Sequence, residues 1–110
     1  MREYNKVQFF REITNQMSDL YEQKNTAYGD SFGRSVEKYG LISALTRISD
    51  KFNRLENLIL HPDVDQDDER VIDTLKDLAS YCIMTYIEII IEEDKSNYST
   101  VENRTLEDKD

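Results

Sequence analysis

The sequence predicts an all-α protein with a single domain. Charged residues make up 34% of its 110 residues and hydrophobic residues 38%, while glycine occurs three times and proline once. No segment alternates polar and apolar residues as a half-buried strand does, and long segments repeat apolar residues at helical spacing. A chain of this length has room for one modest core. We therefore expect one helical domain over residues 1–93 and a polar, flexible C-terminal tail over residues 94–110.

The first helix is predicted from about Tyr4 to about Lys24. Apolar side chains recur there at helical spacing and form a core stripe, made of Phe9, Phe10, Ile13, Met17, Leu20 and Tyr21. The segment KNTAYGDSF at residues 24–32 then breaks the helix, because it contains four turn formers, Asn25, Gly29, Asp30 and Ser31. We therefore expect a turn between two helices in this segment.

Two further helices are predicted between residues 33 and 60. A short helix over residues 33–39 is stopped by Gly40. The next helix spans about residues 41–60 and has an apolar side predicted to be buried, made of Leu45, Ile48, Phe52, Leu55 and Ile59. Its opposite side is polar and holds Arg47, Asp50, Arg54 and Asn57. The His-Pro pair at residues 61–62 ends this helix and begins a polar loop.

The last helix is predicted from about Glu69 to about Glu93 and has two apolar stripes. The main stripe consists of Val71, Leu75, Leu78, Cys82, Tyr86 and Ile89. A second stripe, on another side, consists of Met84, Ile87 and Ile91. A helix with two buried sides needs two partners, and a chain of this length offers few helices. We therefore expect a homodimer or a larger assembly of this chain.

Charge and hydropathy exclude several classes of protein. The net charge of −9 disfavours duplex DNA or RNA, because binding to the phosphate backbone requires a basic surface. No segment is apolar for long enough to span a membrane, and the N-terminus lacks the features of a signal peptide, so we expect a cytoplasmic protein. The single cysteine, Cys82, cannot form an internal disulfide and is expected to be a packed thiol.

A row of acidic residues opens the last helix. Glu69, Asp73 and Asp77 follow one another at intervals of four residues, so they share one helical face and repel one another unless cations or water compensate them. The row is either a metal site or a solvated face. If the two long helices pack antiparallel, Asp50 could approach Glu69 and Asp73, and three carboxylates suit Mg²⁺. Asp50 and Arg54 are also spaced as an ordinary surface ion pair.

The KNTAYGDSF segment has two interpretations. Tyr28 and Phe32 could pack into the core beside a simple turn, or one of them could lie beside a nucleotide base with Lys24 near a phosphate. The sequence contains no glycine-rich phosphate loop, no HExxH motif and no cluster of cysteine and histidine. Neither serine nor cysteine has a histidine partner in the pattern, so the sequence gives no basis for nucleophilic catalysis.

Three segments together resemble a known family. They are KNTAYGDSF at 24–32, RISDKFNRLENLI at 47–59 and ERVIDTLKDLASYCI at 69–83. These resemble the nucleotide-modification-associated domain family of phages and prophages, which looks related to the MazG-like all-α nucleoside triphosphate pyrophosphohydrolases. The resemblance implies a MazG-like helical bundle, assembled as a dimer or tetramer, in which acidic residues bind Mg²⁺ and the metal bridges the phosphates of a nucleotide.

The resemblance also implies roles for individual residues. Asp50, Glu69 and Asp73 would be the metal ligands, and Asp77 would be a further ligand or the catalytic base. Lys51 and Arg54 would contact the phosphates, and Lys24, Tyr28 and Phe32 would shape the nucleotide pocket.

The sequence also departs from the MazG-like pattern. Those enzymes carry EExxE on the first metal helix and ExxD on the second, whereas this chain has only Asp50 on the first, with Arg47 where another acid is expected. The second helix reads ERVID, with one more residue between the acids. Two functions therefore remain open, a Mg²⁺-dependent pyrophosphohydrolase acting on (d)NTPs or modified nucleotides, and a non-catalytic phage protein that sequesters a host nucleotide signal. A helical interaction module without a ligand is a third alternative.

Overall fold

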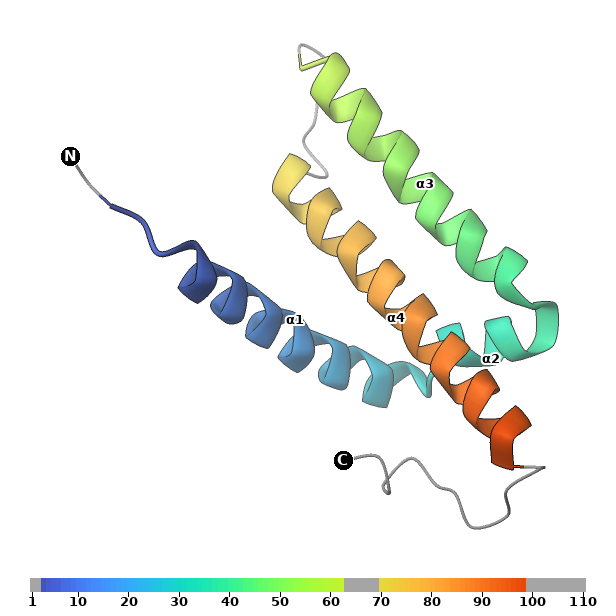
Figure 1. The fold of residues 1–110 in the computed structure, drawn as a ribbon. Coiled ribbons are helices and arrows are strands. Elements are labelled where there is room, and N and C mark those ends of the chain that lie inside the picture. The colour runs from blue at the N-terminus through green and yellow to red at the C-terminus, as the bar shows by residue number, and fades with distance from the viewer. Residues whose placement is uncertain (1–2, 63–69, 99–110) are drawn as a thin grey trace.

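A computed structural model of the chain describes residues 3–62 and 70–98, and helices are the only regular elements within them (Figure 1). The helices, in chain order, are α1 (Lys6–Tyr28), α2 (Ser31–Tyr39), α3 (Leu41–Leu60) and α4 (Val71–Tyr98). The predicted all-α fold is therefore confirmed. None of the helices in these described ranges is long and apolar enough to cross a membrane.

Helices α3 and α4 lie side by side and run in opposite directions (Figure 1). Lys51 Nζ lies 3.1 Å from the Oδ2 atom of Asp77, and Arg47 Nη1 donates a hydrogen bond of 3.4 Å to the hydroxyl of Tyr81. From Arg47 to Lys51 the chain advances four residues along α3, and from Tyr81 to Asp77 it goes back four residues along α4. The two contacts are therefore about one helical turn apart on each helix. The same register places Leu55 of α3 level with Asp73 of α4.

The turn between α1 and α2 depends on two consecutive residues with a left-handed backbone. Gly29 has φ 61° and Asp30 has φ 56°. Glycine adopts this conformation freely, and aspartate is one of the few other residues that tolerate it. Asp30 Oδ1 accepts a hydrogen bond of 3.2 Å from the backbone N–H of Gly33, and the Arg34 guanidinium donates to the carbonyl oxygen of Gly29. These contacts fix the angle at which α1 meets the other helices.

Two helices are longer at their C-terminal ends than the sequence predicts. Helix α1 continues through Tyr28, whereas the predicted break began at residue 24, because Gly29 is the first residue to leave the helical conformation. Helix α4 continues to Tyr98. The tail predicted from residue 94 is therefore helical at its start, where Asp94 is buried and Lys95 Nζ lies 3.6 Å from Glu37 Oε2 on α2. Residues 99–110 lie outside the described residues.

The apolar stripe predicted to be buried on α3 is mostly exposed. Leu45, Phe52 and Ile59 are exposed, and only Ile48 and Leu55 are half-buried. The side of α3 that is shielded in this chain is displaced around the helix and consists of Ala44, Ile48, Lys51, Leu55 and Leu58. The sequence predicts burial of the most apolar side of the helix. In the structure, the side that packs against the other helices includes Lys51, which forms an ion pair with Asp77 of α4.

Of the two stripes of α4 predicted to be buried, only the second is shielded within this chain. Its main predicted stripe is mostly exposed, at Leu75, Cys82, Tyr86 and Ile89. Cys82 is therefore not the packed thiol expected from the sequence. The second stripe is half-buried and consists of Met84, Ile87 and Ile91. That side also carries Thr74, which is fully buried, and Asp77 and Ser80, which are half-buried.

The C-terminal half of α1 crosses α4. The N-terminal half of α1 projects away from the other helices (Figure 1). No residue of α1 is buried, so its predicted core stripe is not buried within this chain. The Cα radius of gyration is 17.5 Å, whereas a compact globule of this length has about 13 Å. The shape is therefore open, and the angle between α1 and the α3–α4 pair leaves a cleft.

We predict that Gly33→Ala destabilises the fold by about 1–2 kcal/mol. A Cβ atom at residue 33 would stand 2.8 Å from Cγ of Asp30, so the carboxylate would lose its hydrogen bond with the backbone of residue 33. Urea unfolding measures the change. In an Asp30→Gly background the same substitution should cost little, and an equal cost in both backgrounds would contradict this explanation.

Candidate functional site

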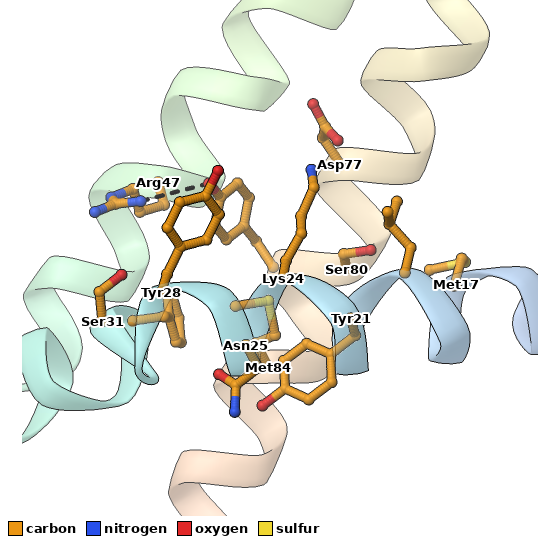
Figure 2. A pocket seen from close by; sticks show the side chains of 13 residues that line it. Met17, Tyr21, Lys24, Asn25, Tyr28, Ser31, Arg47, Asp77, Ser80 and Met84 are labelled. Atoms are coloured by element: carbon orange, nitrogen blue, oxygen red, sulfur yellow. Dashed lines mark hydrogen bonds between the residues drawn. The ribbon is translucent and has the colours of Figure 1, made fainter.

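An open cleft lies where the four helices meet, and its volume is about 420 Å³ (Figure 2). Helix α1 supplies nearly half of its lining, and α4 faces α1 across it. The lining residues are Met17, Leu20, Tyr21, Lys24, Asn25, Tyr28, Ser31, Phe32, Arg47, Asp77, Ser80, Tyr81 and Met84. The cleft thus combines aromatic rings, two cations, one carboxylate and small polar groups.

Aromatic rings form one side of the cleft. Phe32 is only 7% exposed, and its ring centroid lies 5.8 Å from that of Tyr81 at an interplanar angle of 35°. Tyr28 is 66% exposed and stands at the edge of the cleft, where its side chain points toward α3 (Figure 2). Phe32 therefore packs against the ring of Tyr81. The ring of Tyr28 is exposed and can contact a ligand.

Two basic side chains reach the cleft from different helices. Arg47 of α3 lies over the ring of Tyr81, with Cζ 5.9 Å from the ring centroid, and it also donates to the tyrosine hydroxyl. A guanidinium held by a ring face and a hydrogen bond loses little additional freedom when it binds an anion. Lys24 of α1 extends across the cleft toward Asp77 (Figure 2). The two cations therefore line the same cleft, Lys24 beside α4 and Arg47 beside Tyr81.

The acidic row on α4 is compensated within the chain. Asp77 is paired with Lys51, so Lys51 faces α4. Asp73 lies in the first turn of α4, and its Oδ2 accepts a long hydrogen bond of 3.4 Å from the backbone N–H of Arg70. A carboxylate at this end of a helix is also favoured by the helix dipole. These two acids therefore have cationic or dipolar partners without a metal.

The predicted magnesium ligands do not form a cluster in the part of the chain that is described. Asp50 and Asp73 are both exposed, and no three acidic, histidine or cysteine side chains gather closely enough to hold a metal within residues 3–62 and 70–98. Glu69, the third predicted ligand, lies outside the described residues. The Mg²⁺ site therefore stays a prediction from the family resemblance.

The other predicted site residues fall into two groups. The first group lines the cleft: Lys24, Tyr28 and Phe32, which were predicted to shape the nucleotide pocket, and Asp77, which was predicted as a further metal ligand or the catalytic base. Lys51 and Arg54, both predicted at the phosphates, do not line it. Lys51 lies beside the cleft because it pairs with Asp77. Arg54 is half-buried and lies about 10 Å from Arg47 along α3, two turns away.

Most of the lining contributed by α4, and Arg47 of α3, are not among the site residues that the sequence predicts. Arg47 stands where the MazG-like pattern has an acid, and Tyr81 belongs to none of the predicted site groups. A signal for these residues is present in the spacing, because Asp77, Tyr81 and Met84 recur at intervals of four and three. Tyr21, Lys24 and Tyr28 recur in the same way on α1. Which two faces meet depends on the angle of the turn at residues 29–30.

Acidic side chains lie close together beside the cleft. Burial raises the pKa of the Tyr21 hydroxyl, and the carboxylates of Asp30 and Glu88 raise it further. Burial likewise raises the pKa of Glu88, Asp30 and Glu37 add to this effect, and Lys95 opposes it. This side of the molecule therefore repels anions, so an anionic ligand would be attracted to the side of the cleft that carries Lys24 and Arg47.

The fold and this cleft define a small helical protein with a combined aromatic and cationic pocket. The chain belongs to the family described as nucleotide modification associated domain 1, which matches residues 24–89. This span begins at Lys24 and contains the three segments whose resemblance was noted in the sequence, so that family assignment is confirmed. No curated protein and no solved structure matches the chain.

We predict that Lys51 and Asp77 stabilise each other by about 0.5 kcal/mol, since both side chains are partly exposed, at 27% and 43%. A double-mutant cycle with Lys51→Met and Asp77→Asn, followed by urea unfolding at low and high salt, measures this coupling. The coupling should weaken in high salt. Purely additive effects would contradict this mutual stabilisation.

We predict that Glu88→Gln stabilises the protein at neutral pH. The pKa of Glu88 is higher in the native state than in the unfolded chain, so protonation of Glu88 stabilises the native state. As pH rises above about 4.5, the native carboxyl group ionises at a cost and the fold becomes less stable. The increase in melting temperature should therefore shrink as pH falls toward 4.5. Glu92→Gln, at an exposed position one turn later, is the control. A stabilisation by Glu88→Gln that is constant across pH would contradict this account.

Proposed function

We propose that the protein binds a nucleotide in the cleft between α1, α3 and α4. The base would lie against Tyr28 and Tyr81, and the phosphates would contact Lys24 and Arg47. The observation that carries this proposal is that these four side chains, from three helices, line one open cleft. The family description, which names nucleotide modification, supports the same class of ligand.

The size of the cleft suits this ligand. Ligand pockets have volumes of about 300–1,000 Å³, and the cleft has about 420 Å³. An aromatic ring stacked on a base contributes about 1–3 kcal/mol, whichever base it is. Asn25, Ser31 and Ser80 also line the cleft and offer donors and acceptors to a base edge or a sugar. Discrimination between bases would come from these polar groups.

The charges in the cleft suit phosphate despite the net charge of −9. Lys24 and Arg47 approach from different helices, so they can contact different oxygens of one phosphate chain. Arg47 can bind two oxygens at once, because its guanidinium presents several donors in one plane. Asp77, already paired with Lys51, limits how far the phosphates extend toward the start of α4.

The second candidate function is hydrolysis of the bound nucleotide. As in the MazG-like enzymes, a (d)NTP or modified nucleotide would be cleaved to a monophosphate and pyrophosphate. Asp77 supports this candidate, because it is a carboxylate in the same cleft as the two cations. Mg²⁺ held by Asp50, Glu69 and Asp73 would neutralise phosphate charge and acidify a water molecule. The described residues support binding more strongly, since Tyr28, Lys24 and Arg47 line the cleft while Asp77 is engaged by Lys51. A phage protein that sequesters a host nucleotide would need binding alone.

We predict that Tyr28→Ala and Lys24→Met each weaken nucleotide binding about tenfold or more, through the loss of stacking or of a phosphate contact. Isothermal titration calorimetry with a panel of mono-, di- and triphosphates measures the affinities. The matched controls are Tyr39→Ala and Lys38→Met on α2, because Lys38 Nζ lies 5.3 Å from the Tyr39 ring centroid outside the cleft. Equal losses in both pairs of variants would contradict the proposed location.

Hydrolysis is tested separately, by mass spectrometry of the same nucleotides after incubation with and without Mg²⁺. Release of monophosphate and pyrophosphate that is lost in Asp73→Asn would establish the enzyme. Recovery of intact nucleotides that nevertheless bind to the cleft would establish a binding protein.

A further inference from the structure

The folded chain leaves most of its large apolar side chains in water. Among the described residues, only Phe32, Ala44 and Leu58 are buried apolar residues, while twenty large hydrophobic residues are exposed. Folding stability comes mainly from burial of apolar surface, and a core of this size does not balance the conformational entropy lost by four helices. The apolar surface that the described residues leave exposed is therefore available for contact with another molecule.

Helix α1 has an exposed apolar half that continues a face already in use. Met17, Tyr21 and Lys24 face the cleft and α4, and Phe10 and Ile13 lie on the same side of the helix at helical spacing. Figure 1 shows that this N-terminal half of α1 extends beyond the other helices. Phe10 is 71% exposed, and Val7, Phe9 and Ile13 are also exposed. The N-terminal half of α1, here called the arm (residues 6–16), therefore presents an apolar surface that its own chain does not cover.

Helix α4 carries an exposed apolar stripe on the side away from α3. This outer stripe consists of Ile72, Leu75, Ala79, Cys82, Ile83, Tyr86, Ile89 and Ile90. Tyr86 is 67% exposed and lies in the middle of this long helix, between the exposed Ile83 and Ile89. A stable interface buries about 800 Å² on each partner, and the exposed apolar side chains of the arm and the outer stripe supply an area of that order.

We propose that the arm of one chain packs on the outer α4 stripe of a second copy of the chain, and that this contact fixes the α1 wall of the cleft. A second copy is the partner that is present whenever the chain is made, as an interface needed for stability requires. A symmetric pair also covers both surfaces at once, because each chain has one arm and one outer stripe.

Charge favours the same partner. Residues 1–16 contain three basic and two acidic residues, whereas the whole chain has a net charge of −9. The arm therefore carries a small positive charge, which an acidic second copy attracts.

This contact has a consequence for the cleft. Six of its lining residues lie on α1, at Met17, Leu20, Tyr21, Lys24, Asn25 and Tyr28. Within one chain, α1 has no buried residue, and a helix with so few tertiary contacts opens readily. A second copy that holds the arm keeps the rest of α1 helical and in place. The cleft is therefore well ordered only in the dimer, and dimerisation and ligand binding favour each other.

The test needs no nucleotide, so its outcome is independent of the proposed function. Sedimentation velocity over a range of protein concentrations measures the mass of the wild type and of Phe10→Ala/Ile13→Ala. The wild type should sediment as a dimer and the arm variant as a monomer. Asn15→Ala/Gln16→Ala, on exposed polar positions of the same helix, is the matched control and should remain a dimer.

Hydrogen exchange measures the effect on the cleft in the same samples. Amide protection over residues 17–28 should fall at least tenfold in the arm variant and stay at the wild-type level in the control. Tyr86→Ala, on the outer stripe, should reproduce both the loss of mass and the loss of protection.

Circular dichroism decides whether a variant has unfolded. Truncating exposed side chains of an isolated chain changes stability little, so loss of helix in these variants but not in the control supports burial of the arm and the stripe in the dimer. A wild type that is monomeric at every concentration overturns the proposal. So does an arm variant that stays dimeric, or one that becomes monomeric with unchanged protection of residues 17–28.

Discussion

The antiparallel contact between α3 and α4 determines where every other part of the site lies. The pair between Lys51 and Asp77 and the hydrogen bond from Arg47 to Tyr81 are two points on this contact, one turn apart. The first neutralises a carboxylate of the acidic row, and the second holds a guanidinium over a ring. A shift of α4 by one turn would separate both pairs, and the cleft would lose Arg47 or Tyr81. Structure and candidate function therefore depend on the same register.

The turn at Gly29 and Asp30 is the second constraint. Its two left-handed residues direct α1 across α4 instead of along it, which leaves room for a ligand at the crossing. The cost of this arrangement is that α1 gains little burial from its own chain. An open cleft and a poorly covered α1 are thus two results of one backbone geometry, and this is why assembly and ligand binding are expected to be linked.

Much of the fold could be predicted from the sequence, because helix periodicity and helix-ending residues are local signals. The helix over residues 41–60 and the stop at Gly40 agree with the prediction, and so does the family assignment, whose match includes all three segments first noted. The buried faces were predicted less well. Leu45, Phe52 and Tyr86 are strongly hydrophobic, so pattern reasoning assigned them to the core, yet the chain packs a side containing Lys51, Thr74 and Asp77. Pairing between helices depends on geometry that no single helix encodes, which is also why Arg47 and Tyr81 were missed.

The central claim is that a nucleotide occupies the cleft formed at this register. The most direct measurement is a titration of the isotope-labelled protein with nucleotides, followed by amide chemical shifts in two-dimensional NMR spectra. The account predicts that the shifts cluster at residues 21–32, around Arg47 and at residues 77–84, which are distant in sequence and meet only in the cleft. Shifts confined to the exposed acids Asp50 and Asp73, or no shifts with any nucleotide, would contradict it.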